Sequence, residues 1–145
     1  MTKEIPLSVT VHSVIDNLTD VGLPDGDPEI NIFTTDGTLT LGDKGMKLTF
    51  TEKSESDVTT STMFISEANV KLFKRGAVEA DMHFALGIFT KTLYRLGPYA
   101  FDMLIHTKKI RCSLGEDGGE LQLIYSMNVG GQEKNVRMKI TAKGK

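Results

Sequence analysis

Five methionines fall at positions where apolar and polar residues alternate, which places their side chains on the predicted inner face of β-strands: Met46, Met82, Met103, Met127 and Met138. Phe84, Phe101 and Tyr125 share that predicted orientation. Flexible, polarizable thioethers suit a wall that adapts to an apolar guest. They also suit an ordinary packed core. The chain has no tryptophan, so few very large side chains are available to fill a wide interior, and both interpretations stay open.

Arg75 and Arg111 are the polar residues best suited to hold the acidic group of a ligand at the rim of such an interior. A guanidinium group binds a carboxylate or phosphate through paired hydrogen bonds. The alternative is an arginine that caps the end of the sheet or pairs with Asp81 or Glu79. The predicted ligand-binding residues are therefore Met46, Met82, Phe84, Phe101, Met103, Tyr125, Met127, Met138, Arg75 and Arg111.

No catalytic or metal-binding motif is present in the sequence. His12, His83 and His106 lie on strand faces predicted to point to solvent, and the acidic loop from Asp16 to Glu29 lacks the spacing of an EF-hand. Cys112 has no Cys/His partner motif and is expected to be a small buried residue. We therefore predict no catalytic residue, no metal site and no cofactor.

Composition restricts the partners and the compartment. The 145 residues include 17 basic and 19 acidic side chains, a net charge of −2, which argues against a nucleic-acid partner. The single cysteine excludes an intramolecular disulfide, and no run of residues has the pattern of a signal peptide or a membrane span. We expect a single cytoplasmic domain over residues 1–145, with no membrane partner.

The elements that must position these residues are short β-strands. The clearest is a hairpin over residues 119–141, where apolar and polar residues alternate on both sides of a Gly-Gly pair. Glycine tolerates the positive φ angles of a two-residue turn, so Val129 is predicted to lie opposite Gln132. The same register places Tyr125 opposite Val136. A shift of one residue would separate the two apolar faces.

Alternation and turn residues also predict the earlier strands, at residues 5–15, 30–34, 39–41, 46–50, 58–66, 69–75, 77–84, 88–94 and 99–114. A two-residue turn at Asp36-Gly37 is predicted to pair Ile32 with Leu41, and residues 16–28 are predicted to form a surface loop. No segment keeps the spacing of an amphipathic helix. We predict an all-β fold, a closed up-and-down antiparallel barrel of about 8–10 strands. A two-sheet sandwich is the alternative.

Several segments resemble the uncharacterised bacterial YwiB-like family. The residues that carry the resemblance are Arg75-Gly76-Ala77-Val78, Phe84, Tyr94, Pro98-Tyr99, Met103, Ile105, Thr107, Gly119, Leu121 and Leu123-Ile124-Tyr125. The resemblance implies a calycin-type, lipocalin-like barrel and no mechanism. Two related ligand classes do not carry over: the Gly-x-Trp motif of secreted lipocalins is absent, and Arg137-Met138-Lys139 does not match the Arg-x-Tyr pair of fatty-acid-binding proteins.

Three hypotheses follow for the function. The first is a cytoplasmic barrel that binds a small apolar or amphipathic molecule inside, and a connected internal cavity open at one end would favour it. The second is a filled barrel that acts as a protein-interaction or homodimer module, with an outer apolar patch around Met63 and Ile65. The third is an enzyme with its residues gathered at the barrel mouth.

Overall fold

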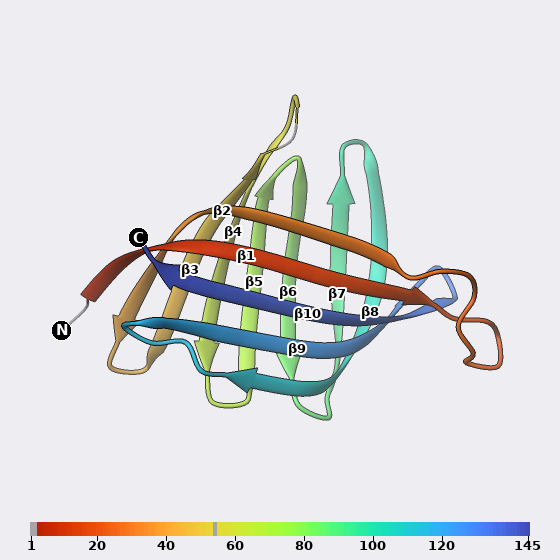
Figure 1. Ribbon diagram of the computed structural model, residues 1–145. Helices are drawn as coiled ribbons and strands as arrows, with labels where there is room; N and C mark the ends of the chain where they lie inside the picture. Colours follow the sequence, from red (N-terminus) through yellow and green to blue (C-terminus); the bar gives the residue numbers. More distant parts are fainter. Residues whose placement is uncertain (1–2, 54) are drawn as a thin grey trace.

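Ten antiparallel β-strands follow one another along the chain in a computed structural model that describes residues 3–53 and 55–145 (Figure 1). The strands are β1 (Lys3–Asn17), β2 (Glu29–Gly42), β3 (Gly45–Lys53), β4 (Val58–Ser66), β5 (Asn69–Gly76), β6 (Val78–Ala85), β7 (Phe89–Leu96), β8 (Tyr99–Cys112), β9 (Gly118–Val129) and β10 (Gln132–Gly144). None of the described residues belongs to a helix that could span a lipid bilayer.

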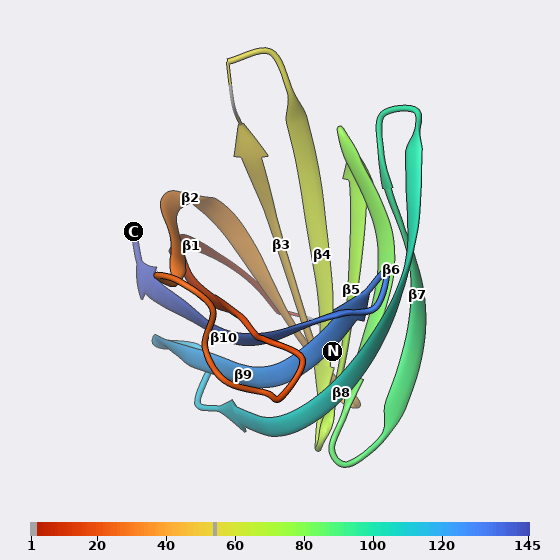
Figure 2. The same ribbon diagram turned by 90° about the vertical axis from the view of Figure 1, so that its right-hand side faces the viewer.

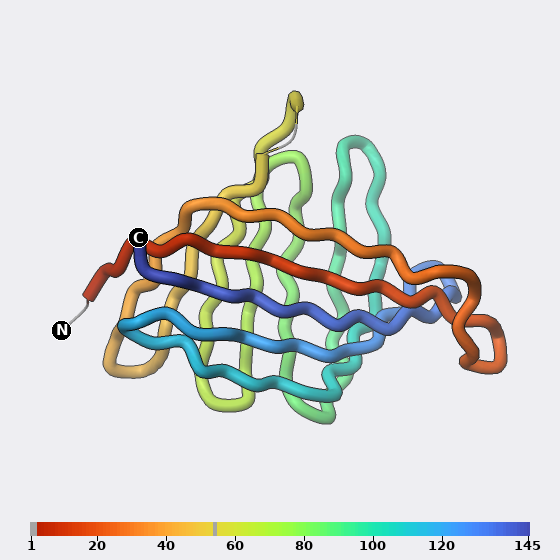
Figure 3. The backbone as a smooth tube through the Cα atoms, in the orientation of Figure 1, coloured from red at the N-terminus to blue at the C-terminus, as the bar shows by residue number. Residues whose placement is uncertain are grey.

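Each strand pairs with its neighbours in sequence, and pairing between β1 and β10 closes the sheet into a barrel. The closing seam runs from Leu7 opposite Gly144 to Asn17 opposite Lys134, and Figure 3 shows the two segments side by side. In Figure 1, β1, β2, β9 and β10 cross the direction of β3 to β7 steeply. The predicted up-and-down barrel is confirmed, and the two-sheet sandwich is excluded.

The C-terminal hairpin has the predicted register. Val129 lies opposite Gln132, and Tyr125 lies opposite Val136. Both turn glycines have positive φ angles, 60° at Gly130 and 88° at Gly131. Local alternation and one Gly-Gly pair were therefore sufficient to define this part of the barrel wall.

The predicted turn at Asp36-Gly37 is wrong, because β2 passes straight through these residues and pairs with both β1 and β3. A Cβ atom on Gly37 would lie 2.7 Å from Cγ2 of Val9 and 2.9 Å from the backbone oxygen of Thr49. The glycine therefore permits close packing of the barrel wall, a role that the sequence Asp-Gly does not distinguish from a turn.

The Gly37→Ala variant is predicted to lower the free energy of unfolding by about 1–3 kcal/mol, because the added methyl group overlaps Val9 and Thr49. The matched control is Gly42→Ala in the same strand, where the nearest atom to a new Cβ is 3.5 Å away. Urea denaturation of both variants measures the difference. Equal unfolding midpoints for Gly37→Ala and Gly42→Ala would contradict this account of the glycine.

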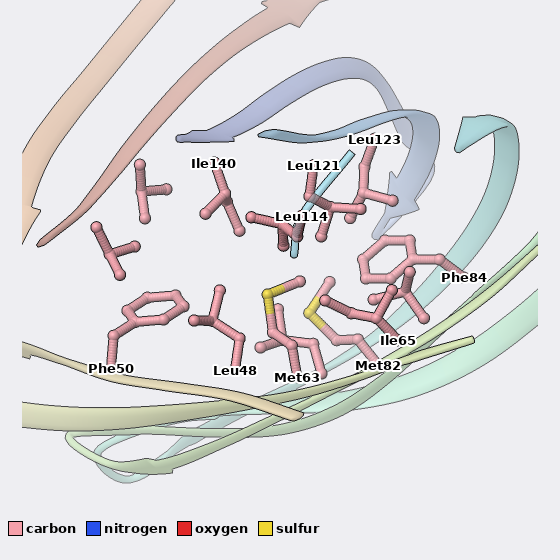
Figure 4. Packing of buried hydrophobic residues seen from close by; sticks show 14 of the residues in the cluster. Leu48, Phe50, Met63, Ile65, Met82, Phe84, Leu114, Leu121, Leu123 and Ile140 are labelled. Carbon is pink, nitrogen blue, oxygen red and sulfur yellow. The ribbon is translucent and has the colours of Figure 1, made fainter. Parts of the chain in front are cut away.

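One half of the barrel interior is densely packed. The largest fully buried side chains are Phe84, Leu7, Leu39, Leu48, Met63, Ile105, Leu121, Leu123, Ile140, Val9, Val70 and Val136. Most of them lie toward the end that carries the β2–β3 and β4–β5 connections. Figure 4 shows Leu121, Leu123 and Ile140 facing Leu48, Met63 and Ile65 across this half. The packed half forms a floor beneath the rest of the interior.

The outer apolar patch predicted around Met63 and Ile65 is wrong, since both side chains are buried inside the barrel. The residue between them, Phe64, points outward and packs edge-on against Phe73, with ring centroids 5.7 Å apart. Phe73 is therefore the outward residue of β5, and Leu72 is buried. This assigns the inward face of β5, which its sequence left open.

Candidate ligand-binding cavity

The other half of the barrel contains a cavity of about 500 Å³. All ten strands contribute side chains to its wall. It lies toward the end with the β1–β2 connection, which projects at the front of Figure 2. Exposed side chains on the wall, including Asn31, Glu52 and Phe101, open it to solvent. The volume is within the range of sites that hold small molecules.

Six of the ten predicted ligand-binding residues line this cavity: Met82, Phe101, Met103, Tyr125, Met127 and Met138. Met82 and Met103 are buried, whereas Phe101 is 43% exposed near the opening. Together they form a flexible apolar wall in which four of the six side chains are thioethers. Their inward orientation is confirmed, and their role in binding stays a prediction.

Phe84 and Met46 also face inward, but neither lines the cavity. Phe84 is completely buried, and its ring centroid lies 4.7 Å from that of Tyr125. It therefore supports the cavity from the packed floor. Met46 lies near the opposite end of the barrel, where it borders two hollows beside the β2–β3 turn that are more open to solvent than the cavity. Neither residue is placed to contact a molecule held in this cavity, and their predicted role in ligand binding stays a prediction.

Arg75 is on the outer face of β5, so its predicted place inside the barrel mouth is wrong. Its Nη2 atom lies 2.6 Å from Oδ1 of Asp81, and its guanidinium group lies 6.0 Å from the ring centroid of Phe73. The inward residue beside it is Lys74. Arg75 thus forms the surface ion pair with Asp81 that the sequence offered as the alternative.

Arg111 is also outside the barrel, and a β-bulge explains why. The register of β8 against β9 shifts between Thr107 and Lys109, which exchanges inward and outward positions over the rest of the strand. Arg111 consequently lies opposite Gln122 on the outer face. Cys112 lies in the same region and is exposed, so the prediction that it is buried is wrong.

The cavity contains charged side chains that the sequence analysis did not select. Each of them extends the inward face of its strand by one step beyond a buried residue: Lys74 after Leu72, Glu52 after Phe50, and Lys134 before Val136. Period-two alternation was the signal that could have identified them. The wall therefore combines thioethers with two ammonium groups and one carboxylate.

Lys74 is the most unusual of these residues. Burial lowers the pKa of its ammonium group, and the negative charge of Glu52 raises that pKa by a smaller amount. Within residues 3–53 and 55–145, no hydrogen bond or ion pair engages the ammonium group. Glu52 itself is exposed near the opening. Lys74 is thus a partly desolvated cation without a counterion in contact.

Neutral hydroxyl groups line the same cavity. Burial raises the pKa of the Tyr94 phenol, and the negative charge of Glu52 raises it further. Burial also raises the pKa of the Tyr125 phenol, and Tyr94 adds to that increase. Both phenols therefore stay protonated at physiological pH. Thr59 and Ser61 add buried hydroxyls to the same wall. The cavity wall therefore combines apolar side chains with several hydrogen-bond donors.

The three histidines lie outside the cavity, on the outer face as predicted. His83 Nε2 lies 2.7 Å from Oδ1 of Asn69, and the His106 ring stacks on Phe89 with centroids 4.4 Å apart. In the part of the chain that the structure describes, no group of three or more His, Cys, Asp or Glu side chains is arranged to hold a metal ion.

Comparison with known proteins identifies the family. The family described as "Domain of unknown function (DUF1934)" matches residues 19–141. The chain belongs to this family. It is 27% identical over 145 residues to the "Uncharacterized beta-barrel protein YwiB" of Bacillus subtilis (strain 168), with 99% of this chain and 97% of that protein covered.

A solved structure gives the same result. The "Crystal structure of ywiB protein from Bacillus subtilis" matches with a TM-score of 0.86 and 27% identity, and the match covers 99% of this chain and 95% of that chain. The resemblance to the YwiB-like family found in the sequence is therefore confirmed. The similarity establishes a β-barrel of unknown function.

The Lys74→Met variant is predicted to raise the free energy of unfolding at pH 7 by about 1 kcal/mol, because it removes a charge that burial disfavours. The native pKa of Lys74 lies below its unfolded value, so the unfolded chain binds more protons between the two values. Stability of the unmodified protein therefore rises with pH in that range. The advantage of the variant should shrink as pH approaches 10.

Urea denaturation at pH 7 and pH 10 measures this effect. Lys71→Met is the control, since Lys71 is an exposed lysine of the same strand that pairs with the outward residue Phe64. It should show no gain that depends on pH. A loss of stability in Lys74→Met at pH 7, or an equal gain at both pH values, would refute the account of Lys74.

Proposed function

We propose that this barrel binds a small, partly apolar molecule in the open half of its interior. The observation that carries the proposal is the cavity of about 500 Å³, which every strand of the barrel helps to enclose. Proteins usually hold small molecules in concave sites that combine apolar walls with a few polar groups. The methionines and the hydroxyl-bearing residues of this cavity give that combination.

The contrast between the two halves of the barrel supports a binding role. In the packed half, inward positions carry branched or aromatic side chains such as Leu39, Leu48 and Phe84, which fill the space. In the open half, several inward positions carry the small polar residues Ser13, Thr59 and Ser61. Small side chains leave volume at the centre of a barrel that larger ones are able to fill elsewhere.

The other two hypotheses have less support. A filled interior does not match the cavity. An enzyme would need titratable groups within hydrogen-bond reach of one another, and among the described residues no such contact joins Glu52, Lys74 and Tyr94. Pairing into a homodimer stays a prediction. The exposed side chains of Phe89, Leu93 and Leu104 on the outer face of β7 and β8 form an apolar surface on which two copies could pair.

The proposed setting is the cytoplasm. Cys112 is the only cysteine, so the fold does not depend on an intramolecular disulfide. The net charge of −2 again gives no reason to propose a nucleic-acid partner.

Binding can be tested with N-phenyl-1-naphthylamine, a neutral apolar dye that fluoresces more strongly in apolar surroundings. The protein should bind the dye with saturation. Met103→Trp should weaken binding at least about tenfold, because the larger side chain occupies cavity volume at a lining position opposite Val129. Fluorescence titration measures both affinities.

The matched control is Leu93→Trp, which adds the same side chain at a half-exposed position on the outer face. It should leave dye affinity unchanged. Absence of saturable binding to the unmodified protein, or equal affinity of Met103→Trp and the unmodified protein, would overturn the proposed function.

A further inference from the structure

Given the proposed function, we infer that the molecule held in the cavity is an amphipathic anion, with a carboxylate head group bound by Lys74 and Ser61 and an apolar tail against the methionines. The inference rests on the proposed binding role and names the chemical class of the ligand. It depends on how charges, hydroxyls and thioethers are distributed over one wall.

Lys74 and Ser61 are direct neighbours. They lie opposite each other in the register of β4 and β5, and both side chains line the cavity. Ser61 is buried, and no hydrogen bond among the described residues occupies its hydroxyl group. An ammonium group beside a hydroxyl donor is a suitable binding site for a carboxylate, because hydrogen bonds to an ionised acceptor are about twice as strong as neutral ones.

The sum of charges on the wall also favours an anion. Lys74 and Lys134 contribute two positive charges and Glu52 one negative charge, so the cavity is positive in a protein of net charge −2. Glu52 is exposed near the opening, where water solvates its carboxylate. Lys74 is partly buried and has no contacting counterion among the described residues, so a bound anion would supply a partner for its charge.

The methionines of the wall determine which kind of tail the ligand has. Met82, Met103, Met127 and Met138 provide thioether and methylene surface without a further charge. Such a surface accommodates a flexible hydrocarbon chain. A fully polar anion would leave this apolar surface in contact with water, so an amphiphile fits the cavity better.

The test is displacement of bound N-phenyl-1-naphthylamine by three ligands of equal chain length, namely decanoate, 1-decanol and decylamine. Decanoate should displace the dye at a concentration about tenfold lower than either of the others, because only its head group pairs with Lys74. If decanol or decylamine displaces the dye as well as decanoate does, the inference is wrong. Dye binding without this preference leaves the proposed function intact, whereas absence of dye binding refutes the proposed function itself.

Three variants locate the head group. Lys74→Met should lose the preference for decanoate over decanol, while Lys71→Met, on the exposed outer side of the same strand, should keep it. Glu52→Gln should strengthen decanoate binding by about twofold or more, since it removes a competing negative charge. Cooperative urea unfolding shows that each variant is folded, and the preference is the ratio of decanoate to decanol concentrations needed for displacement within one variant. An undiminished preference in Lys74→Met, or weaker decanoate binding in Glu52→Gln, would overturn the inference.

Discussion

Closure of one continuous antiparallel sheet is the constraint on which the rest of this structure depends. Once β1 pairs with β10, the order of strands is closed, with the shortest ladder between β6 and β7, where residues 78–80 pair with residues 94–96. Each strand residue then faces either the interior or the solvent. The contents of the interior are then fixed by every second residue of ten strands. A local change of register, such as the bulge after Thr107, moves all following side chains to the opposite face.

The same constraint explains why one barrel contains both a solid floor and a cavity. Inward positions near one end carry leucine, isoleucine, valine and phenylalanine, which pack together (Figure 4). Near the other end they include serine, threonine, methionine and lysine beside aromatic and branched residues, and polar groups surround the space that is left. Burial of Lys74 costs stability, and features that disfavour folding are typical of functional sites.

Sequence alone predicted the parts of the fold that depend on local alternation. The hairpin around Gly130 follows from its period-two pattern, as does the inward orientation of Met82, Met103, Met127 and Met138. The packing role of Gly37 and the outward orientation of Arg111 depend on how neighbouring strands pair. The sequence of a single strand does not contain that information. Lys74 was overlooked because both Leu72 and Phe73 were candidates for the inward face of its strand.

Nuclear magnetic resonance of methionine methyl groups under xenon pressure tests the division of the interior most directly, because xenon enters apolar cavities and is excluded from packed cores. The account predicts saturable shifts for the methyl groups of Met82, Met103, Met127 and Met138, which line the cavity, and none for the fully buried Met63. Shifts of equal size at Met63, or no shifts at the four cavity methionines, would contradict it.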